Sequence, residues 1–293
     1  MRRAPVTVRL HSGLGNQLFQ YAAAVELAQR RGSSIEVSGG EQTIRFLDEL
    51  LGIELLRSHR RLSSSIPAVM RPSQVGLLAN RAIARALGNA CTLVSQTSAT
   101  QYAEPSPSYE HLARTRRPVL LDGYFQHPGY HPWSAGEVAR HAAEQIDRAE
   151  LRSAIGVHLR RGDYVRYGQQ LKPGCVLDAL AATDPMSEHP VSIVSDDALA
   201  AEAFALRVQR AGWADVQAES PGPAHVDLRR LASCQHLVMS NSTFSWWAAA
   251  IGDELWRGHE RVVACPDPWL PTAARPPAPS GRIAYAAQLE VAT

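Results

Sequence analysis

The stretch Ile155–Val165, IGVHLRRGDYV, decides how the rest of the sequence is interpreted. Its apolar beginning predicts a strand over Ile155–Leu159, and Gly162 predicts a break soon after it. In an open parallel sheet, ligands bind beyond the carboxyl ends of the strands. The residues expected at that edge are His158, Arg160, Arg161 and Asp163. Adjacent arginines suit a phosphate or diphosphate. Taken alone, the string also fits the commoner case of a solvated arginine pair with a local carboxylate partner.

The second half of the chain alternates between predicted strands and helices. Further strands are expected over 191–194, near 216, over 236–239 and over 261–264. Helices are expected over 174–182, 198–211, 224–233 and 243–251. This alternation with short connections is typical of a parallel sheet covered by helices on both faces. The proline-rich tail from Pro266 onwards is expected to be mostly irregular.

The first half begins with a strand over Val6–Leu10, followed by GLGNQLFQYA and a helix over about 16–31 that ends at Gly32. Gly-x-Gly lets the backbone approach a ligand closely, but Leu18 replaces the third glycine of a dinucleotide fingerprint. The segments expected after it are a strand at 35–37, broken helices over 41–93, a loop over 95–118, a buried strand in VLLDGYFQHPGY and a helix over 134–152. A boundary after that helix gives two domains, 1–152 and 153–293.

The composition excludes several classes of protein. With 293 residues and 45% hydrophobic content, the chain is long enough to bury a proper core, and its net charge of +2 does not favour nucleic acid. Four separated cysteines, Cys91, Cys175, Cys234 and Cys265, form neither a disulfide framework nor a zinc motif. No apolar run reaches the roughly 18 residues of a membrane-spanning helix, and no signal peptide is recognised. We therefore expect a cytoplasmic protein.

Two more strand ends carry polar residues. Asp196 and Asp197 follow the strand VSIV, where they either cap the next helix or accept hydrogen bonds from the N–H edge of a guanine, and both interpretations stay open. The segment SNSTFSWW begins at Ser240 and places its polar residues at a strand-to-helix turn, which favours an anion site over simple capping. No D-x-D pair exists in the chain, so no metal site is expected.

HLRRGDY, SDD and SNSTFSWW, in this order and spacing, resemble the three motifs of the α-1,2-fucosyltransferases. GLGNQLFQYA and LDGYFQ are similar to the N-terminal half of the bacterial members, which belong to glycosyltransferase family 11. The resemblance covers most of the chain, from about Val6 to Pro268. It implies an α/β, GT-B-like fold of two Rossmann-like domains with a cleft between them, an acceptor-side domain first and a GDP-sugar-binding domain second.

The resemblance also implies which residues bind the donor. Arg160 would hold the β-phosphate and stabilise the GDP leaving group, with Asp163 beside it, and His158 and Asp196 would lie near the guanine. The remaining residues of the expected donor site are Arg161, Asp197, Asn241, Ser242, Thr243 and Ser245, together with Gly13, Gly15, Asn16 and Gln17 of the first domain. The general base is not identified, and the candidates are Asp163, Asp122, His127 and Asp227.

The expected activity is inverting, metal-independent transfer of L-fucose from GDP-fucose to O2 of a terminal β-galactoside, as part of glycan biosynthesis. GDP-fucose and a glycan acceptor are then the partners, no cofactor is needed, and the protein is able to rest against a membrane where its acceptor is made. One alternative is transfer of another GDP-sugar, or transfer to a small-molecule acceptor. A silent nucleotide-binding module is a remote alternative, because the polar residues at the strand ends are all present.

Overall fold

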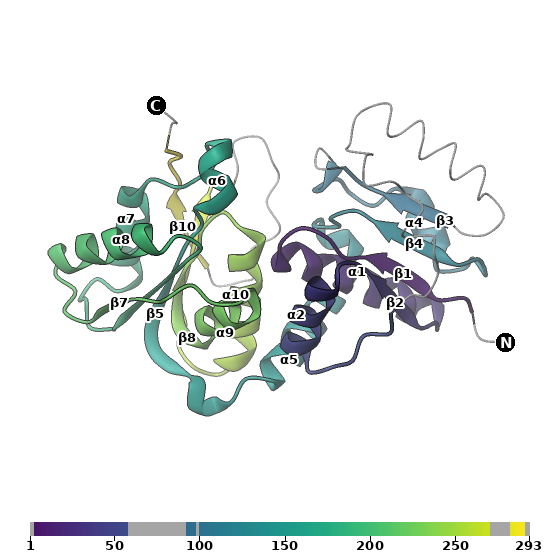
Figure 1. The fold of residues 1–293 in the computed structure, drawn as a ribbon, viewed down its shortest axis with the longest axis horizontal. Coiled ribbons are helices and arrows are strands. Elements are labelled where there is room, and N and C mark those ends of the chain that lie inside the picture. Colours follow the sequence, from purple (N-terminus) through teal and green to yellow (C-terminus); the bar gives the residue numbers. More distant parts are fainter. Residues whose placement is uncertain (1–2, 58–91, 98–99, 270–281, 291–293) are drawn as a thin grey trace. The chain divides into compact units, whose positions relative to one another are not determined.

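A computed structural model describes residues 3–57, 92–97, 100–269 and 282–290, which are coloured along the sequence in Figure 1. The chain divides into two compact units, Met1–Val138 and Ala139–Thr293. Each unit is built on its own parallel sheet. The boundary that we predicted after residue 152 falls later in the chain than this division, and it stays a prediction. Most of the helical region predicted over 41–93 lies outside the described residues, and so does Cys91.

The first unit contains a four-stranded parallel sheet in the order β2-β1-β4-β3. Its strands are β1 (Val6–Arg9), β2 (Ile35–Ser38), β3 (Thr92–Ser95) and β4 (Val119–Asp122). β1 and β4 alternate buried and half-buried residues, as the pleat of a strand requires. The central strands therefore carry the two sequence motifs of this half, GLGNQLFQYA and LDGYFQ, at their carboxyl ends.

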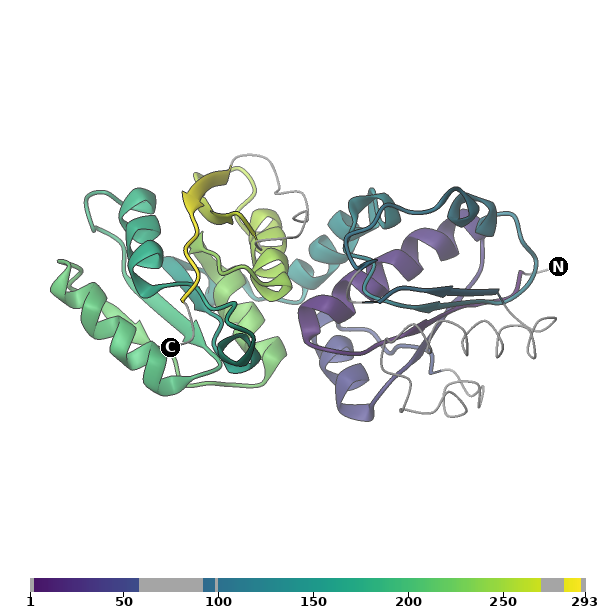
Figure 2. The ribbon, with the colours of Figure 1, turned by 90° about the horizontal axis from the view of Figure 1, so that it is seen from above.

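The helices of the first unit are α1 (Leu14–Arg31), α2 (Glu41–Leu51) and α4 (Pro107–Leu112), with a 3₁₀ turn η3 (Pro128–Tyr130). The helix α5 (Ser134–Glu144) begins in this unit and ends in the second. The helix α1, which lies along the sheet in Figure 2, begins two residues earlier than predicted and ends at Gly32, whose φ of 60° stops it as predicted. Leu18 and Phe19 of α1 are fully buried. The predicted loop over 95–118 contains the short helix α4.

The helix predicted over 134–152 is shorter in the structure, because α5 ends at Glu144. A second 3₁₀ turn, η4 (Arg148–Glu150), follows, and Asp147 and Glu150 form a capping box around it. The hydroxyl of Ser134, the first residue of α5, donates to Ala22 O at 2.7 Å. This serine ties α5 to α1 within the first unit.

The second unit contains a six-stranded parallel sheet in the order β10-β9-β8-β5-β6-β7. Its strands are β5 (Arg152–Leu159), β6 (Val191–Ser195), β7 (Val216–Ala218), β8 (Cys234–Val238), β9 (Val263–Asp267) and β10 (Arg282–Ala286). The helices are α6 (Gly162–Tyr167), α7 (Pro173–Thr183), α8 (Ala198–Arg210), α9 (Ala224–Ser233) and α10 (Thr243–Leu255). The predicted βα alternation is thus confirmed over the second half, with α6 as an additional short helix.

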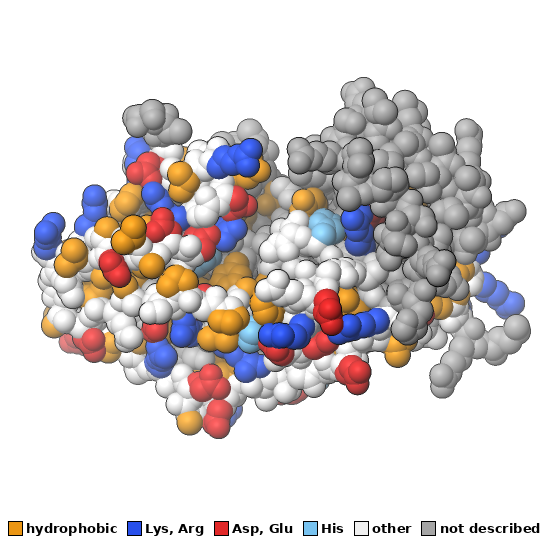
Figure 3. All heavy atoms as spheres, viewed as in Figure 1, with side chains coloured by type: hydrophobic (Ala, Val, Ile, Leu, Met, Phe, Trp, Pro, Cys, Tyr) orange, Lys and Arg blue, Asp and Glu red, His pale blue; other side chains and the backbone are white. Residues whose placement is uncertain are grey.

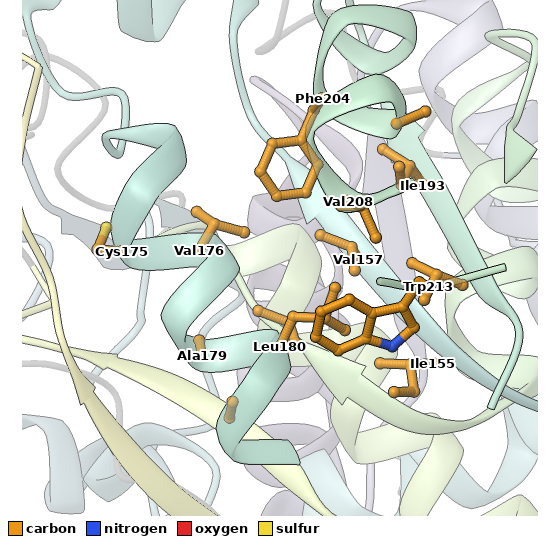
Figure 4. Packing of buried hydrophobic residues seen from close by; sticks show 14 of the residues in the cluster. Ile155, Val157, Cys175, Val176, Ala179, Leu180, Ile193, Phe204, Val208 and Trp213 are labelled. Carbon is orange, nitrogen blue, oxygen red and sulfur yellow. The ribbon is translucent and has the colours of Figure 1, made fainter. Parts of the chain in front are cut away.

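The core of the second unit lies on both faces of β5. Ile155 and Val157 point to one face, where they pack with α7, α8 and Trp213, as Figure 4 shows. A Cβ on Gly156 would meet Leu231 and Cys234, so the intervening position faces α9. Because successive residues of a strand alternate between faces, β5 is covered by helices on both sides, as a central parallel strand should be.

The prediction of an irregular tail from Pro266 onwards was wrong over its described part. Pro266 and Asp267 belong to β9, and β10 pairs with β9 in parallel register. Tyr285 is buried in β10, and its hydroxyl donates to Met239 O at 2.6 Å. The proline-rich segment gave no indication of β10, which has only five residues. This strand is stabilised because it pairs with the free edge of β9.

Candidate functional site

The carboxyl ends of three neighbouring strands bring the three motifs of the second half together. β5 pairs in parallel with β6 on one side and with β8 on the other. His158 is the penultimate residue of β5, Ser195 ends β6, and Ser240 follows the end of β8. Parallel neighbours end at the same edge of a sheet, so these distant segments meet within hydrogen-bonding distance. The sequence predicted this edge as the ligand-binding region.

Arg160 is held at this edge by two carboxylates. Its Nη1 donates to Asp196 Oδ2 at 2.6 Å, and its Nη2 donates to Asp163 Oδ1 at 2.6 Å. Its guanidinium carbon lies 5.4 Å from the centre of the Tyr164 ring. A guanidinium has five N–H donors, so these two contacts orient Arg160 and leave donors for an anion. Asp163 stands here as a support for Arg160, which is one of the roles expected for it.

The two aspartates after β6 have different partners. Asp197 caps α8, because its side chain accepts from the backbone N–H of Ala200 at 3.0 Å. Asp196 accepts from Arg160 through Oδ2, and its Oδ1 accepts from the backbone N–H of Arg161 at 2.8 Å. Capping, which the sequence left open for both residues, therefore accounts for Asp197 alone. Asp196 is the residue that fixes the geometry of the β5–α6 connection.

Gly162 allows the close approach of this connection to Asp196. Its φ is +20°, and a Cβ at this position would collide with Asp196 Oδ2. Only glycine avoids both the backbone strain and the collision. The break that the sequence predicted after β5 is therefore a turn into α6 that wraps around a carboxylate.

His158 is buried in a cluster of hydroxyls. Its Nδ1 lies 2.9 Å from Ser240 Oγ and 2.5 Å from Ser245 Oγ, and its ring packs on Phe244. Burial lowers the pKa of His158 to about 3, and the charge of Arg160 acts in the same direction. The imidazole is therefore neutral, and it joins β5 to α10. Its expected place near a guanine, and that of Ser245 near the phosphates, stay predictions.

The polar residues at the start of α10 are only partly used for capping. Ser242 is the N-cap and accepts from the backbone N–H of Phe244 at 3.3 Å. Asn241 instead donates through Nδ2 to Gln169 O at 3.0 Å, and its backbone oxygen accepts from the Tyr164 hydroxyl. The positive end of the helix dipole lies here, beside the arginines of the β5–α6 connection. Trp246 and Trp247 are buried, as predicted.

A cavity of about 220 Å³ lies beside these strand ends. Its apolar walls include Leu159, Leu171, Val176 and Phe204, and its polar lining includes Arg160, Arg161, Arg207 and Glu290. Sequence reasoning missed Arg207 and Glu290. Arg207 is one of several arginines on the exposed side of a helix, and Glu290 lies beyond the proline-rich segment, so neither position carries a local signal.

The residues expected from GLGNQ surround the start of α1. Gly13 is the N-cap, and Gly15, Asn16 and Gln17 occupy the first turn. Gln17 Nε2 donates to the backbone oxygen of Ser12, whose φ is +65°, and Asn16 Oδ1 accepts from Gln126 Nε2 at 2.7 Å. The side-chain amides thus hold the turn before α1 in shape. A role for these four residues at a diphosphate or a sugar stays a prediction.

The general-base candidates differ in how far their side chains are already engaged. Asp227 accepts from Arg230 and from the backbone N–H of Gly222, and His127 accepts from the backbone N–H of Gly129. These contacts hold local turns. Asp122, at the end of β4, lies 3.4 Å from Arg9 Nη1 and 4.0 Å from His11 Nε2.

The pKa of His11 is lowered from its usual value, and its charged neighbours Asp122 and Arg9 both act on it. Burial lowers the pKa, the Asp122 carboxylate acts in the opposite direction, and Arg9 adds to the lowering. His11 and Asp122 therefore form a partly buried pair at the carboxyl edge of the first sheet. No sequence motif drew attention to His11.

Two classes of feature are missing from the described part of the chain. Over those residues, no three His, Cys, Asp or Glu side chains come close enough to hold a metal ion. The helices described there also include none with the length and apolar character needed to cross a membrane. On the face shown in Figure 3, acidic and basic side chains of the second unit are interspersed rather than gathered by sign.

The segment that contains this edge of the sheet is similar to a known protein family. Residues 122–254, which contain all three motifs of the second half, match the model of Glycosyl transferase family 11. Over this segment the chain is similar to that family. The match begins at the end of β4 and covers the β5–α6 connection, Asp196 and the start of α10.

Two relatives are similar to the chain over different lengths. An alpha-1,2-colitosyltransferase of Escherichia coli is 23% identical over 298 residues, which is 90% of this chain and 98% of that protein. The galactoside 2-alpha-L-fucosyltransferase Sec1 of Mus musculus is 31% identical over 111 residues, or 36% of this chain and 30% of that protein. The chain thus matches less than a third of the length of the mouse relative.

A solved structure supports the fold. A mutant of FUT1 from Arabidopsis thaliana, in complex with GDP, superposes with a TM-score of 0.53 over 92% of this chain and 72% of that one, at 13% identity. At this identity the likeness concerns the fold alone. Together with the two parallel α/β units, it confirms the predicted α/β, GT-B-like class.

Proposed function

We propose that this chain is an inverting glycosyltransferase that moves L-fucose from GDP-fucose to O2 of a terminal β-galactoside in glycan biosynthesis. The observation that carries the proposal is Arg160, held by Asp163 and Asp196 beside the N-terminus of α10. This arrangement offers oriented positive charge at the carboxyl edge of a parallel sheet. The names of the fucosyltransferase relatives support fucose and the α-1,2 linkage.

The proposed reaction places opposite charges on its two halves. The acceptor oxygen forms a bond to the anomeric carbon, while the bond from that carbon to the β-phosphate oxygen breaks and GDP leaves with the electron pair. Positive charge develops on the sugar ring and negative charge on the diphosphate. Three groups are suited to stabilise the negative charge on the diphosphate. They are the remaining N–H donors of Arg160, the partial positive charge at the start of α10, and the nearby Arg161.

The proton of the acceptor hydroxyl leaves to a base or to water. Asp163 is committed to Arg160, and Asp227 and His127 hold local turns. Asp122 is the candidate with the loosest contacts, and the nearby Arg9 and His11 orient it. Asp122 keeps its place among the candidate bases, and a water relay is the alternative route for the proton.

No metal ion takes part in the proposed mechanism. Support comes from the chemistry of the site, where an arginine and a helix N-terminus supply the positive charge that a metal would otherwise supply. The sequence also contains no D-x-D pair. The cytoplasm is the proposed location, with a glycan as acceptor, because the buried cysteines of the described residues, Cys175, Cys234 and Cys265, are thiols, as suits a reducing compartment.

A second candidate function is transfer of colitose in place of fucose. The relative that matches 90% of the chain is named an alpha-1,2-colitosyltransferase. The two candidate functions differ in the sugar that is transferred. The residues of the second unit described above do not separate the two sugars, so the donor must be tested directly.

Calorimetric titration in the presence of EDTA tests the proposal. The purified protein is titrated with GDP, GDP-fucose, the GDP-colitose donor, GDP-mannose and UDP. Binding of GDP but not UDP without metal supports the nucleotide site, and the preferred GDP-sugar identifies the donor. Failure to bind GDP, or binding only with an added divalent metal, overturns the proposed mechanism. Transfer assays on β-galactosides with the preferred donor then test the acceptor.

A further inference from the structure

The C-terminal residues 287–290 run beside the connection between α6 and α7. Lys172 N–H donates to Gln288 O at 2.7 Å, and Glu290 N–H donates to Gln170 O at 2.9 Å. Leu171 and Leu289 form an antiparallel bridge between these two bonds. Backbone hydrogen bonds therefore fix the position of Glu290, although it lies only three residues before the end of the sequence.

This anchoring places the Glu290 side chain at the cavity beside the strand ends. Glu290 is the one carboxylate among the residues that line the cavity, whose walls include Leu171, Val176 and Phe204. At about 220 Å³ the cavity is smaller than the roughly 300–1,000 Å³ that binds a whole drug-sized ligand. An apolar slot of this size suits one flat group, such as a nucleotide base, with the rest of the ligand outside.

The carboxylate oxygens near the site differ in availability. Both oxygens of Asp196 already accept hydrogen bonds, Oδ2 from Arg160 and Oδ1 from the Arg161 N–H. Glu290 Oε2 accepts from Arg161 Nη1 at 2.8 Å, and no hydrogen bond to its Oε1 is found within the described ranges. The Glu290 side chain is 40% exposed. Glu290 thus has acceptor capacity left for a ligand, and unlike Asp163 and Asp196 it lines the cavity.

We propose that Glu290 binds the N–H edge of a guanine seated in this cavity, and that it sets the preference of the donor site for guanine nucleotides. The inference rests on the proposed function. Guanine presents N1–H and the N2 amino group on one edge, and a single carboxylate accepts from both. Adenine presents an unprotonated N1 at the same place, which a carboxylate repels. Arg161, whose Nη1 donates to Glu290 Oε2, holds the carboxylate beside the cavity.

The test compares nucleotides that differ only in this edge. GDP, IDP, which lacks the N2 amino group, and ADP are titrated into the whole protein and into its Glu290→Gln variant. A charged hydrogen-bond acceptor is lost, so we expect GDP affinity to fall roughly 10-fold. ADP affinity should stay unchanged or rise. The preference of the wild type for GDP over IDP should shrink in the variant, because the amide no longer accepts from the N2 amino group as the carboxylate does.

Two control variants make the result decisive. Glu202→Gln makes the same change on the exposed side of α8, and should leave every nucleotide affinity unaltered. Arg161→Ala removes the partner of Glu290 but keeps the carboxylate, and should weaken all three nucleotides while preserving their order. If Glu290→Gln weakens GDP, IDP and ADP equally, or none of them, Glu290 does not read the base and the inference is wrong. If the wild type binds no nucleoside diphosphate at all, the proposed function itself fails.

Discussion

At the scale of a residue, the neighbours of Arg160 determine how much of its positive charge is available to a ligand. Two carboxylates hold its guanidinium and together outweigh its positive charge, so Arg160 is oriented rather than strongly attractive by itself. Arg161 and Arg207, which also line the cavity, bring further positive charge to the same edge. Arg160 differs from a lysine in the planar, forked geometry of its guanidinium group and not in its charge.

We therefore predict that Arg160→Lys lowers turnover by about 10²–10³-fold, the usual cost of one lost donor to a developing oxyanion. Lysine keeps the charge but cannot bridge Asp163 and Asp196 and bind a phosphate at the same time. Steady-state transfer of the sugar measures the effect. Arg166→Lys, on the exposed side of α6, is the matched control and should leave turnover unchanged. Near-normal turnover of Arg160→Lys would show that the fork has no such role.

Gly162→Ala should reduce both nucleotide binding and thermal stability. The new Cβ collides with the Asp196 carboxylate and forces a side chain onto a φ of +20°, so the β5–α6 connection must move. Calorimetry with GDP and a thermal unfolding scan measure the two effects. Gly174→Ala, at a position where a Cβ meets nothing within 4 Å, provides the comparison. Equal behaviour of the two variants would contradict the packing argument.

At the scale of an element, the start of α10 is joined to β5 by a histidine that cannot be charged without cost. His158 is 5% exposed and contacts the hydroxyls of Ser240 and Ser245. The contact fixes the helix N-terminus relative to the strand that carries Arg160. The two parts of the proposed anion site are thus aligned through one neutral imidazole.

This arrangement predicts a pH-dependent loss of stability. The unfolded histidine binds its proton near pH 6.5, and the folded one only near a pKa of about 3. Between these values the unfolded state binds more protons, so the free energy of unfolding falls as the pH is lowered. From about pH 7 to about pH 5, this residue should cost the wild type about 2 kcal/mol that His158→Asn does not lose. Urea unfolding at both pH values measures it.

His259→Asn serves as the control for that experiment, because His259 is exposed. The free energy of unfolding of His259→Asn should change between the two pH values as that of the wild type does. If the unfolding free energies of His158→Asn and the wild type run parallel between the two pH values, then His158 does not titrate as its burial requires.

At the scale of the whole molecule, the last described strand completes the second sheet through buried charges. Asp253 of α10 binds Arg282 of β10 through one carboxylate oxygen and Arg261, just before β9, through the other. Both arginines are less than a tenth exposed. Burial lowers the pKa of Arg282 to about 10, while Asp253 opposes the shift. One carboxylate therefore ties both strands to the helix that begins at the candidate site.

Asp253→Asn should destabilise the protein by about 2 kcal/mol. Breaking a buried ion pair typically costs roughly 3–5 kcal/mol, because a charge is left without compensation, and the partial exposure of Asp253 reduces the figure. Denaturant unfolding measures the change. Asp215→Asn removes an exposed carboxylate in the same unit and should cost almost nothing. A small effect at Asp253 would mean that solvent already screens the pair.

Local sequence signals predicted much of the fold but not every element. The apolar strands, the helix ended by Gly32 and the βα alternation of the second half all depend on neighbours in sequence, and the structure confirms them. The end of α5 and the strand β10 were missed. A 3₁₀ turn with its own cap overrides a continuous helical pattern, and a five-residue strand exists only because β9 offers it an edge.

The sequence by itself determined that His158, Arg160, Asp196 and Ser242 stand at strand or helix ends, because the order of apolar runs and breaks sets those ends. Only the tertiary structure decided what each side chain touches. Asp197 caps a helix while Asp196 holds Arg160, and Glu290 reaches the cavity from the far end of the chain. Side-chain contacts depend on strand order and register, which bring together residues more than a hundred positions apart, and no local pattern encodes that proximity.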